Sequence, residues 1–126
     1  MRIKQFNLSF GSQVFKAFSD ESRVRILNLI FHNNEMCIAD IWHVLEFTQT
    51  KTSRHLSYLK NSGLVSYRKI DQWTFYYIKD EVVDIVTQIF KFMARDSRLI
   101  KDLETHKILF SNRELASYSL KMRKLL

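Results

Sequence analysis

The feature that most constrains this chain is its near lack of backbone breakers. In 126 residues there is no proline, and the only glycines are Gly11 and Gly63. Tight turns depend on such residues, so long helices are favoured over a strand-rich fold. Hydrophobic residues make up 46% of the chain and charged residues 26%, which supplies a packed core and argues against disorder. The sequence therefore predicts one compact, mainly α-helical domain over residues 1–126.

Two helices are predicted in the first third of the chain. Apolar residues recur at helical spacing over residues 20–32, where Ser19 is the predicted N-cap, and again over residues 36–45. The second of these helices contains Cys37, the one cysteine of the chain. A single cysteine excludes an intramolecular disulfide framework and fits a reducing compartment.

The third predicted helix, residues 49–62, differs from the first two because its apolar side narrows to a stripe. Leu56 and Leu59 form that stripe with Thr52 in register, and Gly63 follows where a left-handed helix cap belongs. Two short helices around a tight polar turn, the second rich in polar groups, predict a helix-turn-helix.

A β-hairpin is predicted directly after this motif. Residues 64–70, "LVSYRKI", alternate in polarity, and residues 73–78, "WTFYYI", form an aromatic second strand. Asp71 is the predicted turn residue, because aspartate tolerates the left-handed conformation better than most residues. The predicted fold is thus a winged helix-turn-helix, mainly α with a small β-hairpin wing and extra C-terminal helices.

The last third of the chain predicts more helix. Residues 80–95 are apolar nearly all round, so this helix is either central in the fold or half of a dimer interface. Further helix is predicted over residues 98–110, and Ser111 with Glu114 fits a capping box before a last basic helix. The basic stretch 121–124 either contacts DNA or solvates that helix, and the sequence favours solvation.

The exposed side of the third helix carries the side chains that a major-groove reader needs. Arginine can bond guanine O6 and N7 together, glutamine can bond adenine, and serine or threonine can hold phosphates. The alternative is an ordinary solvated helix face, but the hairpin beside it is basic and favours DNA. The predicted DNA-binding residues are Gln49, Thr50, Lys51, Ser53, Arg54 and His55 on the helix and Arg68, Lys69 and Gln72 on the wing. A net charge of +7, concentrated in the second half of the chain, fits a polyanionic partner such as double-stranded DNA, although a solvated basic surface would give the same value.

Four motifs in order resemble the ArsR-type winged-helix repressors: "FKAFSDESRVRILNLI", "EMCIADI", "TQTKTSRHLSYLKNSGLVSYRK" and "WTFYYI". The resemblance covers roughly residues 12–80 and implies a homodimer whose two recognition helices bind a palindromic operator. It also implies that residues 81–126 form helices used in dimerisation. Two departures stand out: Asp71 replaces the usual wing glycine, which suggests a wider tip, and the residues after about 96 have no counterpart in the shortest members.

The metal sites that the resemblance implies look dismantled in this sequence. Arsenic-sensing members carry several thiolates around the position of Cys37, where this chain has Ala39 and Trp42. Zinc-sensing members place histidines on the helix after the wing, where this chain has Val82 and Met93. We therefore expect no metal and no cofactor, and Cys37 as a small buried hydrophobic residue; a redox-responsive thiol and an unfamiliar metal site are the alternatives.

Other classes of protein are disfavoured. The chain has no phosphate-cradling glycine loop, and Ser53 and His55 point about 200° apart on one helix, so an enzyme is not expected. No apolar run approaches the roughly 18 residues of a membrane helix, and the N-terminus lacks a secretory signal, so we expect a cytoplasmic protein. We predict a transcriptional repressor that responds to an unknown effector. A protein-interaction module on the same scaffold is the alternative.

Overall fold

The computed structural model describes residues 6–118 and 120. It is mainly α-helical with one small antiparallel sheet, which confirms the predicted fold class. No helix in the described part of the chain is long and apolar enough to cross a membrane. The elements in chain order are α1 Leu8–Ala17, α2 Glu21–Asn33, β1 Glu35–Cys37, α3 Ile38–Leu45, α4 Gln49–Asn61, β2 Val65–Ile70, β3 Trp73–Ile78, the 3-10 turn η1 Asp80–Val82, α5 Val83–Phe92 and α6 Ser97–Ser111.

Side-chain caps fix the beginnings of the first helices. The Asn7 carboxamide oxygen accepts the N–H of Phe10 at 2.9 Å and so begins α1. The N-cap of α2 is Asp20, whose carboxylate accepts the N–H of Arg23 at 3.1 Å, and the prediction of Ser19 was wrong by one residue. The Ser19 hydroxyl instead donates backwards to the carbonyl of Lys16 at 2.6 Å, which leaves the capping position to its neighbour.

The sheet has three strands in the order β1-β3-β2, one more than the predicted hairpin. The extra strand, β1, pairs Cys37 with Phe75 of β3. The predicted helix over residues 36–45 therefore begins later, at Ile38, and Cys37 lies at the end of a strand rather than on a helix. Three residues are too few for their alternation to show in the sequence, and the pairing partner lies far along the chain.

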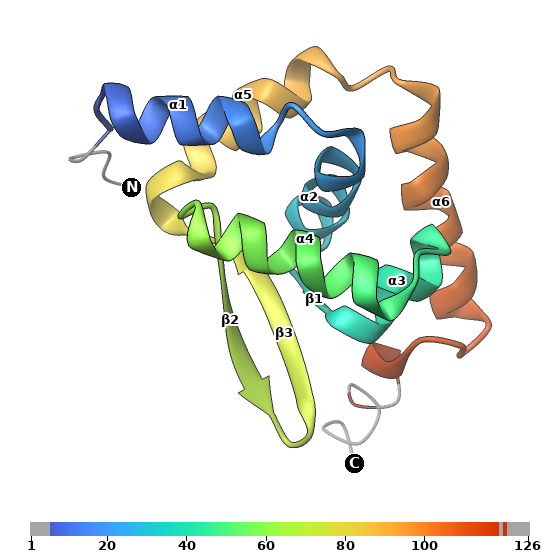
Figure 1. The fold of residues 1–126 in the computed structure, drawn as a ribbon. Coiled ribbons are helices and arrows are strands. Elements are labelled where there is room, and N and C mark those ends of the chain that lie inside the picture. The colour runs from blue at the N-terminus through green and yellow to red at the C-terminus, as the bar shows by residue number, and fades with distance from the viewer. Residues whose placement is uncertain (1–5, 119, 121–126) are drawn as a thin grey trace.

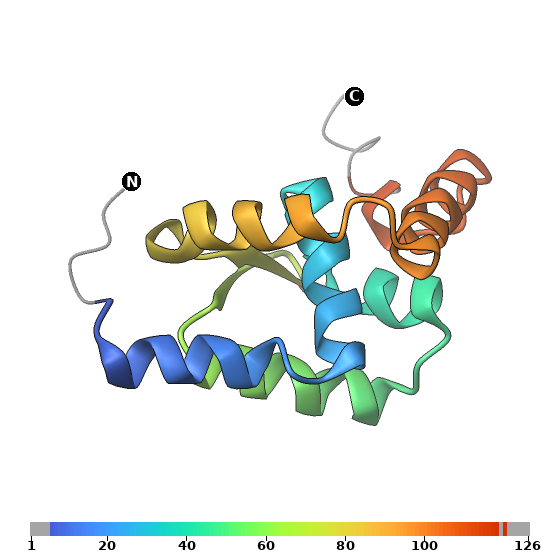
Figure 2. The same cartoon turned by 90° about the horizontal axis from the view of Figure 1, so that it is seen from above.

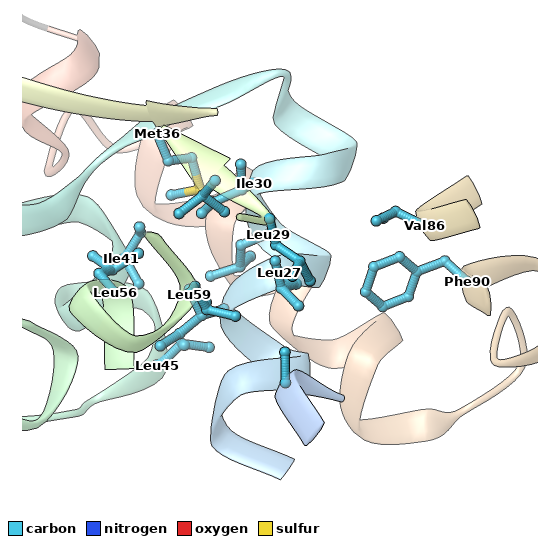
Figure 3. Packing of buried hydrophobic residues seen from close by; sticks show 14 of the residues in the cluster. Leu27, Leu29, Ile30, Met36, Ile41, Leu45, Leu56, Leu59, Val86 and Phe90 are labelled. Carbon is cyan, nitrogen blue, oxygen red and sulfur yellow. The ribbon is translucent and has the colours of Figure 1, made fainter. Parts of the chain in front are cut away.

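The helices form layers around α2. In Figure 2, α1 and α4 lie on one side of α2 and α5 lies on the other, while α6 stands beside α3. The wing formed by β2 and β3 projects from this body (Figure 1). Figure 3 shows the core, in which leucine and isoleucine side chains of α2, α3 and α4 meet, and Val86 and Phe90 of α5 approach from the other side.

The C-terminal third departs from prediction in two places. The predicted helix over residues 80–95 is interrupted, because η1 precedes α5 and α5 ends at Phe92. Only one side of α5 is buried, through Val86 and Phe90, and Phe92 is 88% exposed. The predicted capping box is also wrong, because Ser111 is the last residue of α6 rather than the start of a new helix. The basic residues 121–124 lie outside the described residues.

Candidate nucleic-acid interface

Helix α4 is held in place by its apolar stripe and by caps at both ends. The Thr48 hydroxyl accepts the N–H of Lys51 at 3.0 Å, and the Thr52 hydroxyl donates to the Thr48 carbonyl at 2.9 Å. Leu56 and Leu59 are fully buried against the core. Gly63 follows the helix with φ +85°, which confirms the predicted left-handed cap. A side chain there would also collide with the ring of Phe10.

The opposite side of α4 faces solvent, as predicted for a reading surface. Gln49, Thr50 and Arg54 are exposed, and Ser53 is half-buried. Lys51 is also half-buried, because its ammonium group lies 4.0 Å from the centre of the Phe47 ring. Among the described residues Arg54 makes no ion pair, so its guanidinium can take an external partner.

His55 does not belong to this exposed surface, although the sequence predicted it among the DNA-binding residues of the helix. Only 7% of the residue is exposed, because the helix turns it towards the N-terminal end of α2, near Asp20. Burial lowers the pKa of His55, and the Asp20 carboxylate opposes that effect only in part. The imidazole is therefore neutral near pH 7 and packs within the motif.

Sequence reasoning missed two pairs of a basic and an aromatic side chain beside the exposed side of α4. Arg23 lies 4.1 Å from the centre of the Tyr58 ring, and Lys60 lies 5.1 Å from the centre of the Tyr67 ring. Arg23 also donates to the carbonyls of Lys16 and Ala17 at the end of α1. Tyr58 follows Arg54 by one helical turn, so its place on the same exposed side of the helix could have been predicted from the sequence.

The tip of the wing is narrower than expected. Ile70 pairs directly with Trp73, so Asp71 and Gln72 form a two-residue turn. Asp71 adopts φ +57°, which confirms it as the turn residue and shows that aspartate serves here without a glycine. Gln72 is exposed at the tip, as predicted.

Arg68 and Lys69 are neighbours on β2 but lie on opposite faces of the sheet. Lys69 shares a face with Tyr67, whose ring contacts Lys60 of α4, so Lys69 lies on the side of the reading helix. Arg68 shares the other face with Phe75 and donates to both carboxylate oxygens of Glu35 at 2.8–3.1 Å. This hydrogen bonding raises the pKa of Arg68. The sequence alone had treated both residues as equivalent.

Cys37 is completely buried on the same face as Arg68. It packs with Phe75 and Leu120, and burial raises the pKa of its thiol, which disfavours the reactive thiolate. These observations confirm the prediction of a small buried hydrophobic residue. Within residues 6–118 and 120, no group of three or more histidine, cysteine or acidic side chains is placed to hold a metal ion.

The segment that covers Cys37 is anchored by Asp40 of α3. This carboxylate is buried and accepts the N–H of Ala116 at 2.7 Å and the N–H of Ser117 at 3.0 Å. Two further contacts fix α6 to the motif. Half-buried Arg25 forms an ion pair with buried Asp102 at 2.8 Å, and the Asn28 amide donates to the Leu99 carbonyl at 3.3 Å. Sequence reasoning found none of these anchors.

Comparison with known proteins places this geometry in a family. Residues 20–67, which hold the helix-turn-helix and the first half of strand β2, match the model described as "Bacterial regulatory protein, arsR family". An uncharacterized HTH-type transcriptional regulator of Methanocaldococcus jannaschii is 40% identical over 79 residues, which cover 63% of this chain and 89% of that protein. An arsenic resistance transcriptional regulator of Pseudomonas putida is 37% identical, and the matched segment spans 61% of its length.

Solved structures agree with the sequence relatives. HlyU from Vibrio cholerae superposes on this chain with a TM-score of 0.65, and the two sequences are 28% identical. The superposed region covers 72% of this chain and 99% of the HlyU chain. A fragment of a Mycobacterium bovis protein is described as a homodimeric winged helix-turn-helix DNA-binding domain. It superposes with a TM-score of 0.63 at 25% identity, over 69% of this chain and 81% of the fragment. These relatives are regulators of transcription rather than enzymes. With its four motifs, wing and reading helix in this arrangement, the chain belongs to the ArsR family of DNA-binding transcriptional regulators.

Proposed function

We propose that this protein is a homodimeric repressor that binds a palindromic operator and blocks transcription by occupying it. The observation that carries the proposal is the two-sided character of α4. One side is locked into the core by Leu56 and Leu59, and the other presents exposed Gln49, Thr50 and Arg54 next to the wing. A rigid helix with short polar side chains around one free arginine suits a major groove. A regulator of this kind acts in the cytoplasm, where the operator is.

The proposed contacts divide by chemistry. Arg54 bonds a guanine, Gln49 bonds an adenine or the backbone, and Thr50, Lys51 and Ser53 hold phosphates near the N-terminus of α4. On the wing, Lys69 and Gln72 contact the flanking backbone. Arg68 reaches a phosphate only when it leaves Glu35. His55 supports the helix from inside and contacts no base.

Dimerisation is supported by exposed apolar side chains on α1 and α5. Leu8 and Phe15 are 87% and 75% exposed and lie seven residues apart, on one side of α1. Phe92 at the end of α5 is 88% exposed. Large exposed apolar side chains on two helices support an interface there, and the Mycobacterium bovis neighbour is described as homodimeric. A dimer would place two copies of α4 about 34–36 Å apart, one turn of DNA.

We expect the double variant Phe15→Asp, Phe92→Asp to halve the mass measured by light scattering.

Binding to DNA of the protein's own promoter tests the proposal. Affinity measured by fluorescence anisotropy should fall steeply with salt, because phosphate contacts release counterions. Arg54→Ala should weaken specific binding by about 1–3 kcal/mol and relax base preference at one position. Selection of bound sequences from a random DNA pool would give the operator and its symmetry.

Arg98→Ala is the matched control, because Arg98 is an exposed arginine at the start of α6. It removes the same charge and should leave base preference unchanged. Unaltered affinity and base preference in Arg54→Ala would refute the role of Arg54. No binding of the wild-type protein to any promoter DNA would refute the repressor and favour a protein-interaction module.

A further inference from the structure

A pocket of about 510 Å³ lies between the wing and the C-terminal segment. Arg68 and Ile70 of β2 form one wall, and Phe110 of α6 with Ser117 forms the other. We call it the wing pocket. Its volume is within the range of about 300–1,000 Å³ that is usual for sites of small organic molecules. None of the DNA contacts proposed above on α4 lines it.

The charges in the wing pocket are already balanced. Glu35 and Arg68 both line it, and they are joined by four N–O contacts of 2.8–3.1 Å. An ionised ligand that bonded to one member of this pair would leave the other member without its counter-charge. An uncharged ligand leaves both charges matched, so the pair favours an uncharged ligand.

The remaining walls favour an aromatic ligand with one polar group. The ring of His106 is stacked on that of Phe110, with centroids 6.2 Å apart and an interplanar angle of 19°. Burial lowers the pKa of His106, so this imidazole is neutral near pH 7 and offers a hydrogen bond without a charge. Ser117 adds a hydroxyl, and Ile70 and Phe75 add apolar surface.

We propose that the wing pocket binds a small uncharged molecule that carries an aromatic ring and a hydrogen-bonding group, and that this ligand weakens DNA binding through Arg68. The second part of this proposal, that the ligand weakens DNA binding, rests on the proposed function, because it requires that the wing contacts DNA. The ligand lies against the Glu35–Arg68 pair and displaces water from it.

The direction of the effect follows from electrostatics. Arg68 is exposed, and an ion pair in contact with water is weak, so its guanidinium can exchange between Glu35 and a phosphate. Replacing water by an aromatic ring lowers the local dielectric constant and strengthens the attraction within the pair. Arg68 then stays on Glu35, and the operator loses a phosphate contact.

The first experiment uses the full chain without DNA. The probe is N-phenyl-1-naphthylamine, which is uncharged, aromatic, has one N–H group and fluoresces in apolar surroundings. We expect saturable binding, one probe per chain. Ser117→Phe fills the pocket and should weaken binding at least about tenfold, whereas Ser111→Phe, at the exposed end of α6, should bind as the wild type does.

A second variant guards against misfolding. Phe110→Leu keeps an apolar side chain but removes the stacked ring, so it should also weaken binding of the probe. Thermal unfolding shows whether each variant is folded. If Ser117→Phe does not fold, the affinity of Phe110→Leu for the probe tests the proposal. Absence of saturable binding to the wild type, or wild-type affinity in the folded pocket variants, would overturn the proposal.

The second experiment separates this proposal from the proposed function. Promoter affinity is measured without the probe, which tests the repressor alone, and then with saturating probe. We expect the probe to weaken DNA binding about two- to fivefold in the wild type, no more than Arg68→Ala itself weakens it, and to have no such effect in Arg68→Ala. Normal DNA binding that the bound probe does not alter would overturn the second part of the proposal and leave the proposed function intact.

Discussion

The two faces of the small sheet have different partners. On one face, Met36, Tyr76 and Ile78 pack into the main core beneath α2. On the other face, Cys37 and Phe75 form a second, smaller cluster with Leu120 from the far end of the chain. One face is closed by neighbours in the motif, and the other is closed by the C-terminal segment. Adjacent wing residues can therefore have separate roles, since Lys69 lies on the first face and Arg68 on the second.

The largest expected effect comes from Asp40→Ala, which removes the anchor of the second face. The N–H groups of Ala116 and Ser117 would lose their acceptor, at a cost of about 2–3 kcal/mol in the free energy of unfolding. Urea unfolding gives this value. The rate at which a disulfide reagent modifies Cys37 should rise as well, because the thiol is buried beneath this segment.

Asp84→Ala is the matched control, since Asp84 is an exposed carboxylate in the first turn of α5. Its effect on stability should stay within about 0.5 kcal/mol, and Cys37 should remain protected. Unchanged reactivity of Cys37 in Asp40→Ala would mean that the second face is closed without this anchor.

The next largest effect concerns the first face. Lys69→Ala should reduce the slope of log affinity against log salt by about one and weaken DNA binding roughly uniformly across sequences. Arg68→Ala should have a smaller effect on both, because Glu35 already holds its guanidinium. Salt titrations of promoter binding measure both. The reverse order would mean that the second face, rather than the first, meets DNA.

A smaller effect in the opposite direction is expected from Glu35→Gln. Loss of the carboxylate charge frees Arg68 for phosphate and should strengthen DNA binding by up to about 1 kcal/mol. Glu104→Gln changes the charge equally on the exposed side of α6 and serves as the control. Equal gains in both variants would show a general effect of net charge rather than release of Arg68.

The smallest expected effect is the pH dependence of stability. Burial lowers the pKa of His55 in the motif and of His106 beneath the wing below 6.5. The unfolded chain therefore takes up protons at higher pH than the folded chain, and stability that is complete above about pH 6.5 is lost as the pH falls towards the folded pKa values. We expect each histidine to contribute less than about 1 kcal/mol between pH 7 and 5.

Variants at the two histidines test this pH dependence. Urea unfolding at several pH values should show a flatter pH profile for His55→Gln and for His106→Gln than for the wild type. The variants are compared by the slope of the free energy of unfolding against pH. A general loss of packing lowers the stability at every pH and does not change this slope. An unchanged slope in either variant would show that the histidine titrates alike in both states.

Local patterns predicted the elements that local interactions make. The stripe of Leu56 and Leu59, the cap at Gly63 and the Asp71 turn depend on residues close in sequence, and the structure has all three. Strand β1 was missed because its pairing with β3 is non-local. The placement of His55 failed because a helical wheel gives direction only, and the end of α2 covers that side of α4.

The mainly helical winged helix-turn-helix and the polar side of α4 follow from the sequence alone. Periodicity and turn chemistry carry that information within a few residues. Only the tertiary structure decided that Arg68 and Lys69 have different partners and that Cys37 is sealed beneath the C-terminal segment. It also assigned Asp40 as the anchor of that segment. The hydrogen bonds behind these outcomes join residues 33 to 77 positions apart, and their geometry exists only once the chain has folded.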